Sequence, residues 1–341
     1  MKENIVSETG QCFTCKKSAP FRNQYNIYIC SSCWGKKYEY IYWNDESLLL
    51  KWQRPVTFTH HSLSTILPLP ISFGIECEID FGKLDSVREF QYRLLKKIKT
   101  QSIFSAKSDG SLDCGLEFYS PVLQGERGIR HLEKFCSLAK FLPVKKSCGL
   151  HLHFDARHWS WKDCYKIYLS YGLVEFCLLS VLPLSRRKNS FCRCMPKQIF
   201  NMLPKASSQD DFQLLYWGSR CRIDRASVLR KKELLRCYKN NDYEHRTYHW
   251  DGINLENYWR NFRRKKTLEI RYHHGTTDFQ KIYHWIVINM SIIKWATGFS
   301  ISDLQKRANH PINFEFFVKE ILSGWPLTQQ FAQQRHEKFS S

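Results

Sequence analysis

The chain has 341 residues, of which 43% are hydrophobic and 15% aromatic. This composition can fill a hydrophobic core, so it excludes a largely disordered protein, and the length favours two domains. The 52 Lys and Arg residues exceed the 32 Asp and Glu residues and give a formal net charge of +20, which favours acidic partners such as nucleotides, acidic substrates, nucleic acid or anionic lipid.

The first ten residues lack the apolar core of a secretory signal. The most apolar long run, from Ile167 to Leu184, contains Glu175 and includes Pro183 near its end. We therefore expect a buried helix there and no membrane span. Fourteen cysteines without a secretory signal favour a reducing, cytoplasmic location over a disulfide framework.

Two Cys-x-x-Cys pairs lie close to the start of the chain, Cys12 with Cys15 and Cys30 with Cys33. Tetrahedral Zn²⁺ takes four thiolates, and a Cys-x-x-Cys turn directs two sulfurs at one point. We predict a structural zinc ribbon over residues 1–43, and the alternative is four unlinked thiols in a reduced protein. A stabilising or docking role and contact with nucleic acid both remain open for this ribbon.

The rest of the chain divides into three parts. Residues 44–70 contain Pro55, Pro68 and Pro70 and are predicted to be a linker. Residues 71–299 alternate strand-like and helix-like patterns and form the predicted catalytic domain. Residues 300–341 are predicted to hold a C-terminal helix followed by a frayed, Gln-rich tail.

Four segments alternate apolar and polar side chains with the period of a half-buried β-strand. They are residues 71–81, 116–119, 149–155 and 267–274. Their polar positions carry carboxylates, imidazoles and one arginine, but no lysine. These residues are Glu76, Glu78, Asp80, Glu117, His151, His153, Asp155, Glu269, Arg271 and His273.

Carboxylates gathered on one face of a sheet would destabilise one another unless cations compensate them. Mg²⁺ or Mn²⁺ would do so, with carboxylate oxygens and an imidazole as ligands. The alternative is that these residues are unrelated and lie in separate places. For any single histidine that alternative would be preferred, so the metal hypothesis depends on the whole set.

Amphipathic stripes predict helices between the strands, over residues 84–98, 129–142 and 278–299. Asp278 is a candidate N-cap of the last of these helices. The fold class that follows is α+β, with a mostly antiparallel sheet, helices on one face and a polar site on the other.

Six short motifs, in this order and spacing, resemble those of the amidoligases in the carboxylate–amine ligase group, a family related in fold to glutamine synthetase. They are Gly74-Ile-Glu76-Cys-Glu78, Lys107-Ser-Asp109-Gly-Ser111-Leu112, Glu117-Phe-Tyr-Ser120-Pro121, Cys148-Gly-Leu-His151-Leu-His153, Ser185-Arg186-Arg187-x-Asn189 and Leu268-Glu269-Ile-Arg271. The resemblance covers about residues 71–299 and does not explain the cysteine pairs.

The resemblance implies an ATP-dependent ligase that forms an amide bond from a carboxylate and an amine through an acyl phosphate. The carboxylates that it implies as magnesium ligands are Glu76, Glu78, Glu117 and Glu269. It implies that His151 and His153 contact metal or phosphate. It also implies that Arg271, Arg187 and Lys107 steady the phosphate or the acyl phosphate, and that Arg186, Asn189 and Asp109 are supporting residues.

Two other functions remain open from the sequence. The first is a metal-dependent hydrolase or nuclease that uses the Glu/His face. The second is a basic zinc-ribbon protein that binds nucleic acid and whose second domain is inactive. The chain lacks the Gly-x-x-x-x-Gly-Lys-Ser/Thr loop, so a nucleotide would not be held as in P-loop enzymes. For a ligase, the expected partners are small-molecule or peptide carboxylates and amines.

Overall fold

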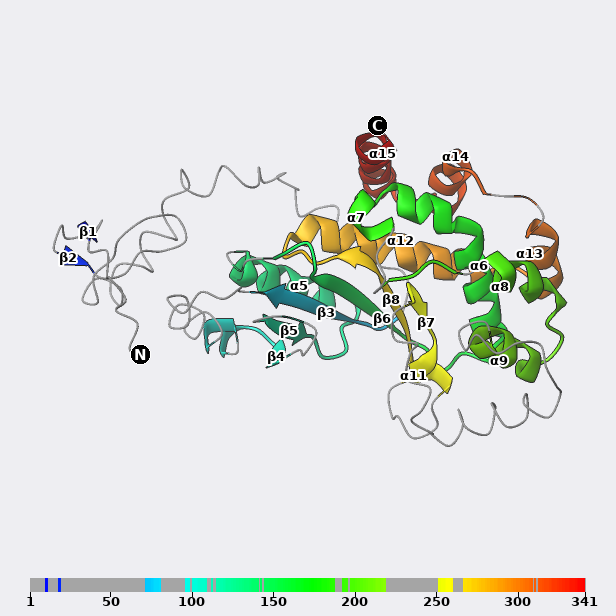
Figure 1. Cartoon of the computed structure of the whole chain (residues 1–341), viewed down its shortest axis with the longest axis horizontal. Helices are drawn as coiled ribbons and strands as arrows, with labels where there is room; N and C mark the ends of the chain where they lie inside the picture. Colours follow the sequence, from blue (N-terminus) through cyan, green and yellow to red (C-terminus); the bar gives the residue numbers. More distant parts are fainter. Residues whose placement is uncertain are drawn as a thin grey trace, which may run out of the picture. The chain divides into compact units, whose positions relative to one another are not determined.

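The contacts of the computed structural model divide the chain into two units, one of Met1–Thr65 and Gly82–Lys97 and the other of Ile66–Phe81 and Ile98–Ser341. Figure 1 draws the described helices and strands as coloured ribbons. The residues that the structure describes are 10–11, 18–19, 71–80, 96–98, 100–108, 112, 115–140, 142, 144–187, 192–195, 197–218, 251–259, 266–308, 310 and 312–340.

In the first unit, strands β1 (Gly10–Gln11) and β2 (Ser18–Ala19) pair in antiparallel fashion. They flank the segment of the sequence that contains Cys12 and Cys15. These two cysteines, Cys30 and Cys33 all lie outside the described residues, as does the linker 44–70. The zinc ribbon and the linker therefore stay predictions.

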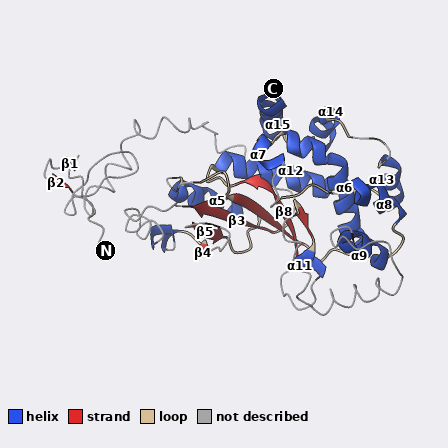
Figure 2. Ribbon diagram, viewed as in Figure 1, coloured by secondary structure: helices blue, strands red, loops and turns tan. Residues whose placement is uncertain are grey.

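The second unit is built on a six-stranded antiparallel sheet with the order β4-β5-β3-β6-β8-β7 (Figure 2). The strands are β3 (Phe73–Asp80), β4 (Ser105–Ser108), β5 (Gly115–Tyr119), β6 (Gly149–Asp155), β7 (Ile253–Asn254) and β8 (Thr267–His274). The two edge strands are short, and the four strands predicted from alternation form the middle of the sheet. The predicted α+β class is confirmed, whereas the relation to glutamine synthetase stays a prediction.

Three long helices pack together beside the sheet, α5 (Gly125–Ala139), α6 (Trp161–Ser180) and α12 (Phe279–Thr297). Phe118 of β5 contacts the ring of Phe135 in α5, so the apolar positions of the strands face the helices. Asp278 caps α12 as predicted, because its side chain accepts from the backbone N–H groups of Gln280 and Lys281. None of the helices in the described part of the chain combines the length and apolar character that a bilayer span requires.

The shorter helices lie partly between α6 and β8 in the chain and partly after α12. They are α7 (Leu184–Arg187), α8 (Lys197–Met202), η3 (Leu203–Lys205), α9 (Gln209–Gly218), α11 (Glu256–Trp259), α13 (Ile301–Arg307), α14 (Phe314–Phe316), the π-helix η5 (Phe317–Ile321) and α15 (Pro326–Ser340). The predicted helix over 84–98 lies mostly outside the described residues.

The Gln-rich tail differs from its prediction, because it forms helix α15 where the sequence suggested fraying. Thr328 and Ala332 of this helix are buried. The hydroxyl of Thr328 lies 3.0 Å from Nδ1 of His284 in α12, and Phe331 stacks on the same imidazole. Few apolar residues are therefore enough to dock this helix, because buried polar contacts accompany them.

His273 does not lie on the polar face where alternation predicted it. Between β6 and β8 the register shifts, so that Leu150 pairs with His273 while Leu152 pairs with Ile270. Arg271 and Tyr272 thus both lie opposite the single residue between the two leucines, as in a β-bulge. Beyond the shift, His273 is buried on the helix side, where its ring lies 5.2 Å from that of Trp285 in α12.

Candidate functional site

Cross-strand pairing arranges the polar side chains on one side of the sheet in three rows, and we call this surface the polar face. The first row is Lys107, Glu117 and Glu78, the second is Ser105, Tyr119, Glu76 and His151, and the third is Gly74, His153, Glu269 and Asn254. Because neighbouring strands lie about 4.8 Å apart, this register brings together residues that are far apart in the sequence. The register thus places these carboxylates and imidazoles next to one another on one face of the sheet.

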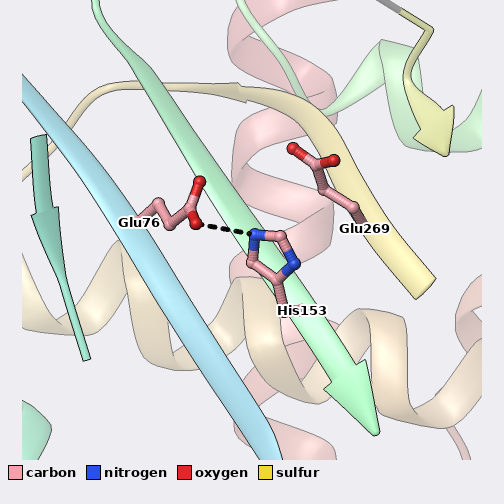
Figure 3. A group of neighbouring side chains, drawn as sticks. All are labelled: Glu76, His153 and Glu269. Carbon is pink, nitrogen blue, oxygen red and sulfur yellow. Dashed lines mark ion pairs between the residues drawn. The ribbon is translucent and has the colours of Figure 1, made fainter. Parts of the chain in front are cut away.

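Glu76, His153 and Glu269 form the tightest group on the polar face (Figure 3). One ligand atom from each residue lies within 4.8 Å of the other two. Nε2 of His153 is 3.4 Å from a carboxylate oxygen of Glu76. Two carboxylates and an imidazole suit a divalent cation such as Mg²⁺ or Mn²⁺, so these residues fit the predicted metal.

The imidazole of His151 lies among three carboxylates. Its Nδ1 is 3.5 Å from Glu76 and 3.7 Å from Glu269, and its Nε2 is 3.5 Å from Glu78. These distances are long for hydrogen bonds, and Nδ1 is buried without a hydrogen bond to any described residue. His151 therefore carries a buried nitrogen atom that a ligand could engage.

Glu269 is held by two donors from its own edge of the sheet. Nη1 of Arg271 donates to one carboxylate oxygen at 2.6 Å, and Nδ2 of Asn254 donates to the other at 2.9 Å. Asn254 is fixed in turn, because its Oδ1 accepts from the hydroxyl of Tyr216 and the backbone N–H of Glu256. The Nε group of Arg271 is buried without a hydrogen bond within the described part of the chain, which leaves a donor for a bound anion.

Glu78 and Glu117 occupy the other end of the polar face. The carboxylate of Glu78 accepts from the backbone N–H of Gly149 at 2.6 Å. Glu117 makes an ion pair of 2.8 Å with Lys107, whose side chain is 57% exposed. Since Lys107 reaches solvent while Glu117 is buried, the ammonium group of the lysine is accessible to a ligand that enters from outside.

The mixture of charges shifts the pKa values of the group in opposite directions. Burial would raise the pKa of Glu76, but the close imidazoles of His151 and His153 outweigh it and lower that pKa far below its usual range. Burial would lower the pKa of His153, but Glu76 and Glu269 outweigh it and raise that pKa. Burial raises the pKa of Glu117, and the neighbouring Glu76 raises it further. The group thus binds positive charge well, and a metal ion would compete with protons for it.

Three residues of the predicted polar set, and Arg187 from the resemblance, are engaged elsewhere. Asp80 pairs with Lys145 at 2.9 Å, and Asp155 forms hydrogen bonds with Arg157. His273 lies on the helix side, as described above. Arg187 donates to the main-chain carbonyls of Leu179, Leu182, Ser180 and Phe339. The structure therefore gives Arg187 helix-end carbonyls as partners and does not bring it to the polar face, although the resemblance suggested contact with phosphate.

Of the three supporting residues implied by the resemblance, the structure describes one. Arg186 is buried and donates to the main chain of β8. Asp109 and Asn189 lie outside the described residues.

The sequence did not single out two residues that shape the site. Asn254 lies in a two-residue strand, which is too short to show alternation. Gly149 matters because a Cβ at this position would lie 2.8 Å from Nε2 of His151 and 3.4 Å from the Glu78 carboxylate. Its place directly before the Leu-His-Leu-His stretch was the available signal.

A family model described as "Putative amidoligase enzyme" matches residues 72–293. Among solved structures, the chain is similar to a bifunctional glutathione synthetase from Pasteurella multocida, with 13% sequence identity and a TM-score of 0.42. This match covers 83% of the chain and 49% of the synthetase, so the chain spans about half the length of that protein. A comparison with curated proteins gives no match.

Proposed function

The chain belongs to the amidoligase family, and from this premise we propose that it is an ATP- and Mg²⁺-dependent carboxylate–amine ligase. The observation that carries the proposal is the tight group of Glu76, His153 and Glu269, with Arg271 bonded to Glu269. Phosphoryl transfer needs a cation for the phosphate oxygens and a fixed donor for the developing negative charge. The polar face offers residues for both tasks.

The proposed reaction has two steps. First, an oxygen of the substrate carboxylate attacks the γ-phosphorus of ATP, and the bond from that phosphorus to the β–γ bridging oxygen breaks, which releases ADP. The nitrogen of the amine then attacks the acyl phosphate carbon. The carbon–oxygen bond to phosphate breaks, an amide forms, and the proton lost by the amine passes to solvent or to a nearby carboxylate.

The resident metal would be held by Glu76, His153 and Glu269, with Glu78, Glu117 and His151 within reach of further phosphate-bound cations. When bound, Mg²⁺ or Mn²⁺ would neutralise charge on the phosphate oxygens. Asn254 and Arg271 hold the Glu269 carboxylate from both sides, so that its orientation is fixed before the ligands arrive.

Arg271 and Lys107 have different tasks in this proposal. The guanidinium of Arg271 is mostly buried, and its Nε group faces no protein acceptor among the described residues. It is suited to stabilise charge on the transferring phosphoryl group in a fixed geometry. The exposed Lys107 is suited to attract the anionic carboxylate or nucleotide at the opposite end of the polar face. Arg187 has no part in the chemistry, because main-chain carbonyls take up its donors.

The proposed reaction can be tested by tracing a labelled oxygen atom from the substrate carboxylate to inorganic phosphate. The purified protein is incubated with ATP, Mg²⁺, a pool of amines and carboxylates labelled with ¹⁸O. We expect phosphate release that requires both substrate classes, with one ¹⁸O atom in each inorganic phosphate, because the acyl phosphate leaves with a carboxylate oxygen.

Matched variants separate the site from the rest of the protein. Glu269→Gln keeps the shape but removes a charge, so turnover should fall by orders of magnitude, whereas Glu126→Gln on the exposed surface of α5 should not change it. Arg271→Lys should also reduce turnover, because lysine lacks the planar pair of donors. Release of unlabelled phosphate without amide, or cleavage of a phosphodiester, would instead establish a hydrolase.

A further inference from the structure

The short helix α7 contacts the main chain of β8 through the side chain of Arg186. Arg186 is 2% exposed, and it donates from Nε to the carbonyl of Tyr272 at 3.1 Å and from Nη2 to the carbonyl of Arg271 at 2.9 Å. These two carbonyls belong to the residues at which the register of β8 shifts. Arg186 thus holds the backbone of the segment that carries the site arginine.

The backbone of Arg271 is also held from the other side. Its N–H group donates to the carbonyl of Gly252 at 2.8 Å. A bulged strand lacks part of its regular ladder of hydrogen bonds, so such partners decide where the bulged residues lie. A shift of this backbone would move the guanidinium of Arg271 relative to Glu269.

Helix α15 holds α7 in turn, although it lies outside the region that matches the family model. Nη2 of Arg187 donates to the carbonyl of Phe339 at 2.8 Å. Nε of Arg335 donates to the carbonyl of Val181 at 2.8 Å, in the turn between α6 and α7. The ring of Phe339 lies 4.9 Å from the guanidinium of Arg335. Two arginines, one on each helix, therefore link α15 to the chain that leads into Arg186.

We propose that Arg186 is a positioning residue for Arg271 and that helix α15 keeps Arg186 in place. This inference rests on the proposed function, because it assigns the C-terminal helix a role in the geometry of the proposed ligase site. The contacts form a continuous path from Phe339 and Arg335 through α7 to the backbone of β8. Its links are hydrogen bonds from arginine side chains to main-chain carbonyls. Such charge-assisted bonds fix the position of a backbone segment better than apolar contacts do.

Hydrogen exchange of β8 tests the positioning without any need for turnover. Arg335→Met removes the bond to Val181, and a chain that ends at Lys338 loses both the carbonyl and the ring of Phe339. We expect amide exchange in a peptide covering residues 267–274 to become about tenfold faster in both, while β3 and β5 keep their rates, since losing a charge-assisted bond shifts a local equilibrium by at least this factor. Arg130→Met, which removes an exposed arginine of α5, is the matched control.

Kinetics then distinguish positioning from general stability. If Arg186 positions Arg271, both variants should lose about tenfold in kcat while KM for ATP changes by about twofold or less, because the lost interaction acts in the transition state. Faster exchange confined to α15 and the end of α6, with β8 unchanged, overturns the inference. An unchanged kcat in a variant whose β8 amides exchange faster also overturns the inference. A wild-type chain that forms no amide would refute the proposed function, whereas the exchange result would still decide the positioning.

Discussion

Two pairs of histidines on neighbouring strands are surrounded by charges of opposite sign. His151 and His153 of β6 lie among carboxylates on the polar face, and the pKa of His153 is raised. His273 and His274 of β8 lie beyond the register shift, and burial together with the nearby Arg335 lowers both pKa values, that of His274 to about 3.

The comparison shows that burial alone does not decide what a histidine can do. Burial lowers the pKa in both strands, but Glu76 and Glu269 outweigh it around His153, whereas Arg335 adds to it around His274. The first surroundings attract a cation and the second repel one. A histidine pair in a sequence is therefore a candidate ligand only when carboxylates share its face of the sheet.

The largest difference should appear when one histidine of each pair is replaced. His153→Gln removes the imidazole between Glu76 and Glu269, and we expect turnover and Mn²⁺ affinity to fall by about 100-fold or more. His273→Gln should lower the free energy of unfolding by about 1–3 kcal/mol and leave turnover per folded molecule unchanged. Steady-state kinetics and Mn²⁺ titration check both variants. Equal losses of turnover and Mn²⁺ affinity in the two variants would contradict the different roles of the two histidine pairs.

A methyl group at residue 149 should disturb the first pair without touching the second. In Gly149→Ala, the new Cβ would meet Nε2 of His151 at 2.8 Å and the Glu78 carboxylate at 3.4 Å. We expect a loss of about 1–3 kcal/mol in unfolding free energy and a lower Mn²⁺ affinity. Gly298→Ala is the control, because the nearest atom to its Cβ is at 3.4 Å. A Mn²⁺ affinity of Gly149→Ala equal to that of the parent protein would mean that the His151 imidazole can move away from the new methyl group.

The second pair should set part of the acid sensitivity of the fold. His274 has a pKa of about 3 in the folded protein against 6.5 as its ordinary value. Between these values the unfolded chain binds a proton that the folded protein does not, so stability falls as the pH falls below 6.5. The groups that act on it are Arg335, Lys281 and Arg186, opposed by Asp278.

His274→Gln should therefore reduce the stability lost between pH 7.5 and pH 5 by up to about 2 kcal/mol. Denaturant unfolding at the two pH values measures this. His284, whose pKa burial lowers to about 4, contributes a loss of the same sign that should remain. A loss that is as large in the variant as in the parent would show that His274 is protonated in the folded protein.

The smallest effect should come from Lys107 at the edge of the polar face. In Lys107→Met, unfolding free energy should change by less than about 1 kcal/mol, because the lysine is largely exposed. Lys107 lowers the pKa of Glu117, so its removal should raise that pKa further. We expect Mn²⁺ affinity to weaken more at pH 6 than at pH 8. An equal change at both values would indicate that Glu117 does not titrate in this range.

Much of the sheet and its polar face could be predicted from the sequence, because alternation reports directly on which side chains share a face. The bounds predicted for the strands 149–155 and 267–274 are those of the structure. The convergence of Glu76, His151, His153 and Glu269 followed from the alternation once the strands were assumed to share a sheet.

The remaining features depend on contacts that alternation does not encode. The register shift at Arg271 and Tyr272 turned His273 to the helix side. Asn254 reaches Glu269 from a strand of two residues, and one acceptor of Arg187, the carbonyl of Phe339, lies 152 residues away in the sequence. Helix α15 has few apolar residues, so its docking through Thr328 and Arg335 gives no periodic signal.

The register shift in β8 also affects how residues can be matched between this chain and its relatives. The strand has one extra residue at this point, because Arg271 and Tyr272 both lie opposite His151 while His273 pairs with Leu150. A relative that lacks one residue at this point could keep both its site arginine and its helix-side residues on the same faces. An alignment that forbids a gap within a strand would then exchange the two faces from this point onward, and would assign a buried core histidine to the site.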